Sequence, residues 1–435
     1  MIGLPPFLSF SENERILQLK TLMIILRTVK NISSLNIAAS VLLFLAAILA
    51  AVVANSSLSP VYQDFLLQEL HLRIGNFNLF SHGGHPLKMI EFINDCLMTV
   101  FFLAVGLEIK RELLVGELSS VRKAALPFIA ACGGMVVPVV IYALSVASGT
   151  PETRGMAIPM ATDIAFSLGV LSLLGKRVPL SLKIFLTAFA VVDDIGGILV
   201  IALFYSADVA YGYLIAAAVL YVFLYYMGKF GVTQKIFFLF FGVIIWYLFL
   251  QSGIHSTISG VILAFVIPAR PRLDAGKYIE RIRDIIGEFP VSKSDNIVLT
   301  NAQIATLKQV ERASDYVISP LQSLEDNLHG AVSFVILPLF AFANAGVVFS
   351  GSGSIVGDVS IAVAAGLLLG KFLGIYLFTW LAVKSGVALM PAGMNWKNIA
   401  GVSLLGGIGF TVSLFIANLS FADEYPELLN QAKFG

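Results

Sequence analysis

Charged residues are scarce in this chain. They make up 13% of its 435 residues, whereas ordinary globular domains carry roughly a quarter. Hydrophobic residues reach 58%, and the mean hydropathy is +0.89. The net charge of +1 by itself says little, and no nucleic acid partner is expected. The composition therefore excludes a water-soluble domain and predicts an all-α polytopic membrane protein in contact with membrane lipid.

Cysteine is almost absent. Cys96 and Cys132 both fall within apolar stretches, so we interpret them as small buried side chains rather than a disulfide or a redox centre. The first residues also lack a short apolar core followed by a small-residue cleavage site, and we expect no signal peptide. Nothing in the sequence indicates a cofactor.

Apolar windows of about 20 residues predict the membrane spans. Eleven such windows begin near Ile37, Met89, Ala124, Gly155, Ser181, Ala210, Lys235, Gly253, Gly330, Ser360 and Asn398. They divide the chain into an amino-terminal segment (1–36), spans one to eight (37–268), a polar insert (269–328) and spans nine to eleven (329–435).

Basic residues are distributed very unevenly between the two sides of these spans. Of the 28 Lys and Arg residues, 23 lie on the side of the amino terminus, four lie on the opposite side, and Lys371 lies inside a span. Because cytoplasmic loops are enriched in Lys and Arg, the amino terminus is expected in the cytoplasm.

Two connecting segments have a recognisable pattern. Residues 70–79 alternate in polarity around Gly75-Asn76, which predicts a β-hairpin on the outer side, with an edge able to pair with another subunit. In the cytoplasmic insert, one face of a short amphipathic helix is marked by Ile279, Ile282, Ile285 and Ile286, and we expect this helix to lie against the membrane surface.

Four charged residues lie inside predicted spans: Asp163, Asp193, Asp194 and Lys371. A charge at bilayer depth costs about 2.5–3.5 kcal/mol by insertion scales, so such residues are usually functional rather than structural. Three acids and one base at this depth indicate a pathway for a cation or for protons.

Two spans carry signals of an interrupted helix. Pro159 precedes Asp163 in the fourth span, and Gly406, Gly407 and Gly409 precede Thr411 in the eleventh. A proline removes a backbone hydrogen bond, and interrupted helices in corresponding parts of two halves indicate a transporter binding site near the bilayer midplane. Close helix packing is the alternative explanation for the glycines.

Adjacent acids can bind either protons or a metal cation. Burial and mutual repulsion disfavour the charged forms of Asp193 and Asp194, while their oxygens suit a small hard cation. Occupancy by one excludes the other, so exchange follows from competition at a single site. Lys371 is the expected counter-charge, pairing with one aspartate and releasing it when the cation arrives.

Titratable residues also gather near the ends of spans. A cluster at the cytoplasmic end of span two consists of Glu108, Lys110, Arg111 and Glu112, which either anchor the helix at the interface or attract cations or sense pH. His255 and His329 are further candidates for pH sensing, since histidine titrates near neutrality, although a lone histidine is more often only hydrogen-bonded.

Other functions also place acids inside a membrane. An intramembrane aspartyl protease needs one Asp from each of two spans, which Asp163 and Asp193 satisfy, but it leaves Lys371 without a role. A symporter or a channel with broken helices is the nearer alternative, and the direction of proton flow on adding sodium distinguishes symport from exchange. We favour a transporter over an enzyme.

At these residues the chain resembles the NhaA family of sodium/proton antiporters. The resemblance runs from about Ile93 to the carboxyl end and is carried by FFLAVGLEIKREL (101–113), AIPMATDIAFSLGVLSLLGKRVPLSLKIFL (157–186), VVDDIGGI (191–198), LPLFAFANAGV (337–347) and LLLGKFLGI (367–375). It implies a helical bundle of inverted-topology repeats with two broken, crossing helices.

The resemblance also implies residue roles and physiology. Asp194 and Asp193 are implied as the Na⁺- and proton-binding pair, with Asp193 paired to Lys371, and Thr162 and Asp163 as polar residues at the crossing. The cytoplasmic cluster implied for pH activation consists of Glu108, Arg111, Glu112 and Glu325. The implied activity is electrogenic exchange of cytoplasmic Na⁺ or Li⁺ for external H⁺ in the bacterial cytoplasmic (inner) membrane, by a homodimer joined at the hairpin.

Three features depart from the family pattern. Asp326 stands where the family often has His, and the insert around Ala275 to Ser314 has no counterpart that we recognise. The chain also stops at Gly435, where a twelfth span is expected to begin, and we interpret the sequence as incomplete there.

Overall fold

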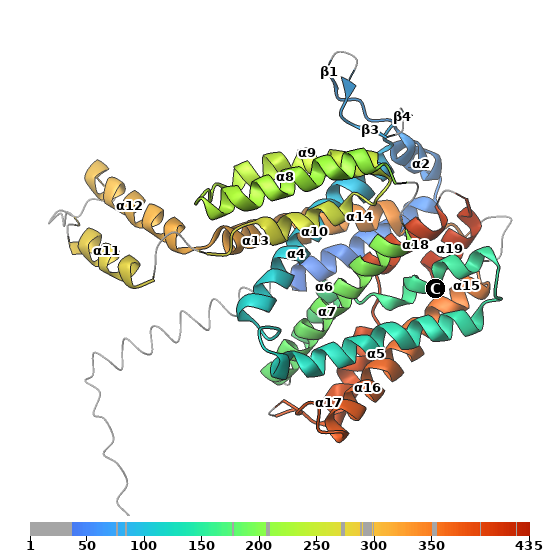
Figure 1. Cartoon of the computed structure of the whole chain (residues 1–435). Helices are drawn as coiled ribbons and strands as arrows, with labels where there is room; N and C mark the ends of the chain where they lie inside the picture. Colours follow the sequence, from blue (N-terminus) through green and yellow to red (C-terminus); the bar gives the residue numbers. More distant parts are fainter. Residues whose placement is uncertain are drawn as a thin grey trace, which may run out of the picture.

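The computed structural model describes residues 37–435, except 75–76, 83–84, 176–177, 206–208, 271–274, 288, 290–297, 299, 350–354, 392 and 423. The amino-terminal segment (1–36) lies outside the described residues. Long helices form one bundle, with short strands at one end and a pair of helices projecting from another side (Figure 1).

The bundle contains the membrane spans that the apolar windows predict. Among the described residues, nine helices are long and apolar enough to cross a bilayer, one further pair is bent by 41°, and one apolar helix is shorter. The first helix spans Ile37–Ala54. The uninterrupted helices that follow are α5 (Val121–Ser145), α7 (Leu180–Phe204), α8 (Tyr211–Lys229), α9 (Lys235–Ser252) and the short α10 (Thr257–Val266).

Three spans contain a π-helical turn that the sequence did not predict. Their parts are α3 (Met89–Phe92), η1 (Ile93–Leu97) and α4 (Met98–Val115); α13 (Pro320–Ala331), η4 (Val332–Ile336) and α14 (Leu337–Asn344); and α15 (Asp358–Ala365), η5 (Gly366–Lys371) and α16 (Phe372–Lys384). Such turns are rare and occur frequently at functional sites. Lys371 is the last residue of one of them.

Two spans are interrupted, as expected from Pro159 and the glycine cluster. The fourth consists of the 3₁₀ helix η2 (Pro151–Met160) and α6 (Ile164–Leu173), and the eleventh of α17 (Trp396–Gly406) and α18 (Thr411–Phe421). A last helix, α19 (Pro426–Phe434), follows. Non-helical backbone at this depth is tolerated only inside protein or along a water-filled cavity, so the surrounding helices must cover both breaks.

Helix α5 packs against α7 and α16 (Figure 1). A Cβ atom added to Gly133 of α5 would lie 2.3 Å from the carbonyl oxygen of Gly374 of α16. Only glycine allows the two backbones to approach this closely, and this fixes the depth of the nearby Lys371 relative to α5.

A second group of helices, α8, α9 and α10, packs on the other side of α4 (Figure 1). Its core includes Leu224, Phe238 and Ile245. The Lys110 amine of α4 donates to the carbonyl oxygens of Ala264 at 3.3 Å, Phe265 at 2.7 Å and Ile267, and so caps the carboxyl end of α10. A cation at a helix carboxyl terminus satisfies carbonyls that lack an intrahelical partner.

The predicted outer β-hairpin is present. Strand β1 (Arg73–Ile74) pairs antiparallel with β2 (Phe77–Asn78), while the predicted turn at Gly75-Asn76 lies outside the described residues. A second pair, β3 (Ser81–His82) with β4 (His85–Pro86), was not predicted.

The short helix α2 (Ser59–Leu67) precedes these strands. Burial raises the pKa of its Tyr62 to about 12, so the hydroxyl stays protonated and donates to the carbonyl oxygen of Phe342 at 2.6 Å. This bond ties α2 to α14.

The polar insert contains the predicted amphipathic helix, α11 (Ala275–Gly287), in which Ile279 and Ile286 are exposed. A second helix, α12 (Asn301–Val317), packs on α11 and was not predicted. Figure 1 shows both projecting from the bundle. The helix that enters the membrane after the insert already begins at Pro320, ahead of the apolar window near Gly330.

Candidate ion-binding site

The two interrupted helices meet at their breaks. The backbone N–H of Asp163 donates to the carbonyl oxygen of Ile408 at 2.8 Å, and the Thr162 hydroxyl donates to the carbonyl oxygen of Gly406, also at 2.8 Å. Ala161 and Asp163 have extended backbone angles, because the chain does not resume a helix until Ile164. Each break therefore supplies hydrogen-bond partners that the other lacks.

Asp163 holds this crossing together through its carboxylate. One oxygen accepts from the backbone N–H of Phe166 at 2.9 Å, and the other accepts from the backbone N–H of Thr411 at 3.2 Å and from its hydroxyl at 2.9 Å. Asp163 thus caps the amino termini of both α6 and α18, where a negative charge is favoured by the helix dipole.

Thr411 was not among the predicted site residues. Its signal in the sequence was its position directly after the glycine cluster, at the start of a new helix. That position does not reveal its partner, since Asp163 is 248 residues away along the chain.

The adjacent aspartates lie in the middle of α7 and have different surroundings. The Lys371 ammonium lies 2.9 Å from one Asp193 oxygen and 2.7 Å from the other, and both side chains are fully buried. Thr162 also lies within hydrogen-bonding reach of Asp193, which connects the ion pair to the crossing. Asp193 is therefore neutralised by a fixed partner.

Asp194 is 6% exposed and points elsewhere, since neighbouring residues of a helix are about 100° apart. Within the described parts of the chain, no residue makes a hydrogen bond or ion pair with the Asp194 carboxylate. Asp193, Glu108 and Asp163 are close enough to add negative potential at this group. A buried, unpartnered carboxylate in a negative environment is suited to bind a proton or a cation.

The predicted cytoplasmic cluster is brought together by α4 and α13. Arg111 lies 3.2 Å from a Glu112 oxygen and 3.1 Å from a Glu325 oxygen. Glu108, one turn back along α4, interacts electrostatically with all three. Because it also contributes to the potential at Asp194, Glu108 connects this cluster to the buried aspartates.

The two histidines do not join that cluster. His329 is exposed on α13, as is Asp326. His255 lies between α9 and α10, where its ring nitrogen is 3.5 Å from Asp95 and its other ring nitrogen is 2.9 Å from the Thr257 hydroxyl. The four acidic and basic residues of the cluster and His255 thus form two separate titratable groups.

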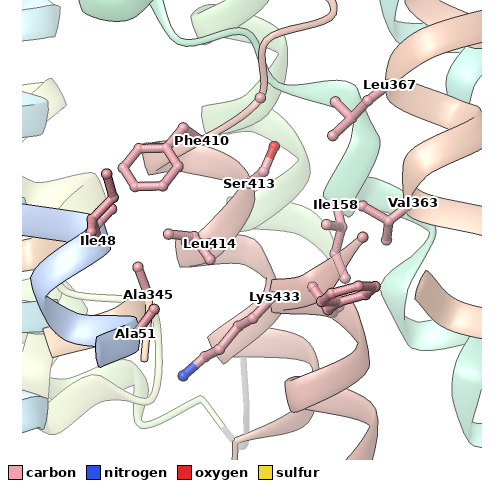
Figure 2. Close-up of a pocket in the computed structure, with 15 residues that line it drawn as sticks. Ile48, Ala51, Ile158, Ala345, Val363, Leu367, Phe410, Ser413, Leu414 and Lys433 are labelled. Atoms are coloured by element: carbon pink, nitrogen blue, oxygen red, sulfur yellow. The ribbon is translucent and has the colours of Figure 1, made fainter. Parts of the chain in front are cut away.

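A hollow of about 320 Å³ lies apart from these carboxylates, between the first helix, α15, α18 and α19. Figure 2 shows mainly apolar side chains around it, with the Lys433 amine and the Ser413 hydroxyl as polar exceptions. A lysine amine repels a cation, so this hollow does not compete with the aspartates as an ion site.

The architecture and the site define a class of protein. A polytopic helical bundle in which two broken helices cross beside buried carboxylates has the construction of a secondary ion transporter. The family model described as Na⁺/H⁺ antiporter 1 matches residues 30–435, and the chain belongs to this family.

Curated relatives agree with the family assignment. The Na⁺/H⁺ antiporter NhaA of Bacteroides thetaiotaomicron is 75% identical over 413 residues, which cover 95% of this chain and 94% of that protein. The NhaA of Parabacteroides distasonis is 50% identical, covering 96% and 93%, and NhaA 1 of Saccharophagus degradans is 43% identical, covering 91% and 84%. The predicted family is confirmed. The chain is a multi-pass bacterial membrane protein and a transporter of Na⁺ and H⁺ rather than an enzyme.

Proposed function

We propose that this antiporter expels Na⁺ or Li⁺ from the cytoplasm in exchange for external H⁺, and that the cation and the protons compete for Asp193 and Asp194. One observation carries the proposal: Asp194 is buried and has no hydrogen-bonding partner among the residues that the structure describes, and it is directly beside an aspartate whose charge is already neutralised by Lys371. In this pair, the Asp194 carboxylate is available to bind an ion, and the Asp193 carboxylate becomes available when Lys371 moves away.

In the proposed cycle, the cation enters from the cytoplasmic side and binds first to Asp194. Oxygen ligands suit a small hard cation, and Thr162 and Asp193 lie nearby to supply more of them. As the cation gains Asp193, the Lys371 ammonium leaves that carboxylate. After the cation is released on the outer side, protons bind to the two vacated carboxylates, and the transporter returns to its starting state.

The family resemblance implies the charge balance of the exchange. Two protons moving inward against one Na⁺ moving outward transfer one net charge per cycle, which the membrane potential drives at about 2.3 kcal/mol per 100 mV. The asymmetry of basic residues supports a cytoplasmic amino terminus in the inner membrane, and the paired outer strands support a homodimer.

We assign pH activation to the cluster of Glu108, Arg111, Glu112 and Glu325, with His255 and His329 as further candidates. The ion pair between Arg111 and Glu325 holds α4 to α13 while Glu325 is charged, and Glu112, on α4 itself, shares the same arginine. Protonation of Glu325 removes this contact between the helices, and Glu108 transmits the change in charge to Asp194.

The Asp194→Asn variant tests the proposal. It keeps the size of the side chain but removes its charge, and sodium-dependent proton movement in proteoliposomes is expected to fall below about 1% of wild type at every pH, since a charged ligand contributes several kcal/mol. Asp358→Asn, at the exposed start of α15, is the matched control and should keep full activity. Wild-type exchange by Asp194→Asn would refute the proposal.

Competition itself is tested by the pH dependence of the apparent KM for Na⁺. As pH falls, protons occupy the carboxylates, so KM is expected to rise by up to about tenfold per pH unit for each competing proton. A KM that is constant between acid and alkaline pH contradicts a shared site.

A further inference from the structure

The buried ion pair has an aromatic neighbour that the exchange scheme does not use. Phe189 lies on α7 one helical turn before Asp193, so both side chains share one face of the helix. The ring is completely buried, and the Lys371 Nζ atom lies 5.7 Å from its centroid. This distance is within the range of about 6 Å over which an ammonium is attracted to the negative face of an aromatic ring.

The ring packs closely against two glycines on other helices. A Cβ atom on Gly134 of α5 would lie 3.3 Å from the Phe189 ring, and one on Gly406 at the end of α17 would lie 3.4 Å from it. Gly406 also provides the carbonyl that binds Thr162 at the crossing. Phe189 therefore lies beside both the ion pair and one of the helix breaks.

Lys371 needs somewhere to go when it leaves Asp193. An unpaired charge in a protein interior costs several kcal/mol. The charged groups that face the ammonium are Asp193 and Asp194, and in the proposed function the incoming cation engages both. The Phe189 ring, whose centroid is 5.7 Å from the ammonium, then offers a nearby surface with negative potential.

We propose that the face of Phe189 is the second binding position of the Lys371 ammonium, occupied while Asp193 binds the transported cation. This inference rests on the proposed function and adds a positioning residue to it. The ring stabilises the displaced ammonium, and it thereby determines how easily Na⁺ takes Asp193. Weakening the ring's negative face leaves the lysine on Asp193, so it raises the KM for Na⁺ while the maximal rate changes little.

Stepwise fluorination of the ring tests this without changing its size appreciably. Protein carrying 4-fluoro-, 3,5-difluoro- and 3,4,5-trifluorophenylalanine at position 189 is compared in sodium-driven proton exchange at one pH. Each fluorine withdraws electron density from the ring face. The logarithm of KM is expected to rise with each fluorine and to reach about threefold to tenfold for the trifluoro ring, equivalent to about 0.7–1.4 kcal/mol.

Phe185 provides the matched control. It is one turn further back on α7 and 3% exposed, and no cation in the described part of the chain lies over its ring. The same fluorine series at position 185 should leave KM unchanged. Phe189→Leu, which keeps apolar bulk but has no ring, should raise KM at least as much as the trifluoro ring.

A flat series at position 189, or an equal slope at position 185, overturns the inference. So does a uniform loss of maximal rate with constant KM, because that result describes packing rather than attraction of the ammonium. These outcomes leave the proposed function standing if Asp194→Asn is inactive. Conversely, exchange by Asp194→Asn refutes the function whatever the fluorine series shows.

Discussion

Replacing Lys371 with Met removes the ammonium that neutralises Asp193 and leaves a carboxylate that is 1% exposed without its partner. Breaking a buried ion pair from one side typically costs about 3–5 kcal/mol. An unfolding entropy of about 2.1 cal/mol/K per residue amounts to about 0.9 kcal/mol/K for 435 residues. The Lys371→Met protein is therefore expected to melt about 3–5 °C below wild type.

The reverse variant, Asp193→Asn, is expected to lose less stability than Lys371→Met. The lysine it leaves unpaired still has Asp194 as an electrostatic partner, whereas the carboxylate left by Lys371→Met has no second cation nearby. The double variant Asp193→Asn/Lys371→Met contains no uncompensated charge. It should recover most of the stability that Lys371→Met loses, because a protein with a buried ion pair and one with apolar groups of similar volume in its place often have similar stability.

Thermal unfolding of the four detergent-solubilised proteins, followed by tryptophan fluorescence at a fixed pH, measures this cycle. The double variant should melt within about 2 °C of wild type, which gives a coupling free energy of about 3 kcal/mol between the two positions. Simple additivity of the two single changes would contradict the reasoning, since it would mean that neither charge depends on the other. Transport is expected to be lost in all three variants.

Two further predictions concern the crossing and the helix packing. Thr411→Val keeps the shape of the side chain but removes a hydrogen bond to the Asp163 carboxylate. The expected loss of stability is about 1.5–3 kcal/mol, so the melting temperature should fall by about 2–3 °C. An unchanged melting temperature would contradict the capping role of Asp163. Gly133→Ala forces a Cβ atom against the Gly374 backbone and should lower the melting temperature by about 1–3 °C. Gly401→Ala, in open space on α17, should raise it slightly, because alanine favours a helix by about 1 kcal/mol. Equal effects of the two alanine variants would show that the close approach of α5 and α16 carries no energetic constraint.

The sequence by itself determined the features that depend on local pattern. The length of an apolar run is set by the thickness of the bilayer, so the spans could be read directly, and a charge inside such a run costs enough to mark Asp163, Asp193, Asp194 and Lys371. Pro159 and the glycines likewise located the two breaks, because both residue types act on the backbone where they stand. The amphipathic helix α11 and the outer hairpin could also be predicted, because each follows from the pattern of residues within one short segment.

The tertiary structure decided which of these residues meet. Residue types and spacing left open which aspartate Lys371 pairs with, and the family resemblance implied Asp193; in the structure Lys371 lies on Asp193, while Asp194 has no partner among the described residues. It also revealed that Asp163 caps both half-helices with the help of Thr411, and that Phe189 lies beside the ammonium. These contacts join residues far apart along the chain, and they depend on the depth and rotation of whole helices. Depth and rotation follow from close packing between helices, such as that of Gly133 on Gly374, which no local pattern in the sequence encodes.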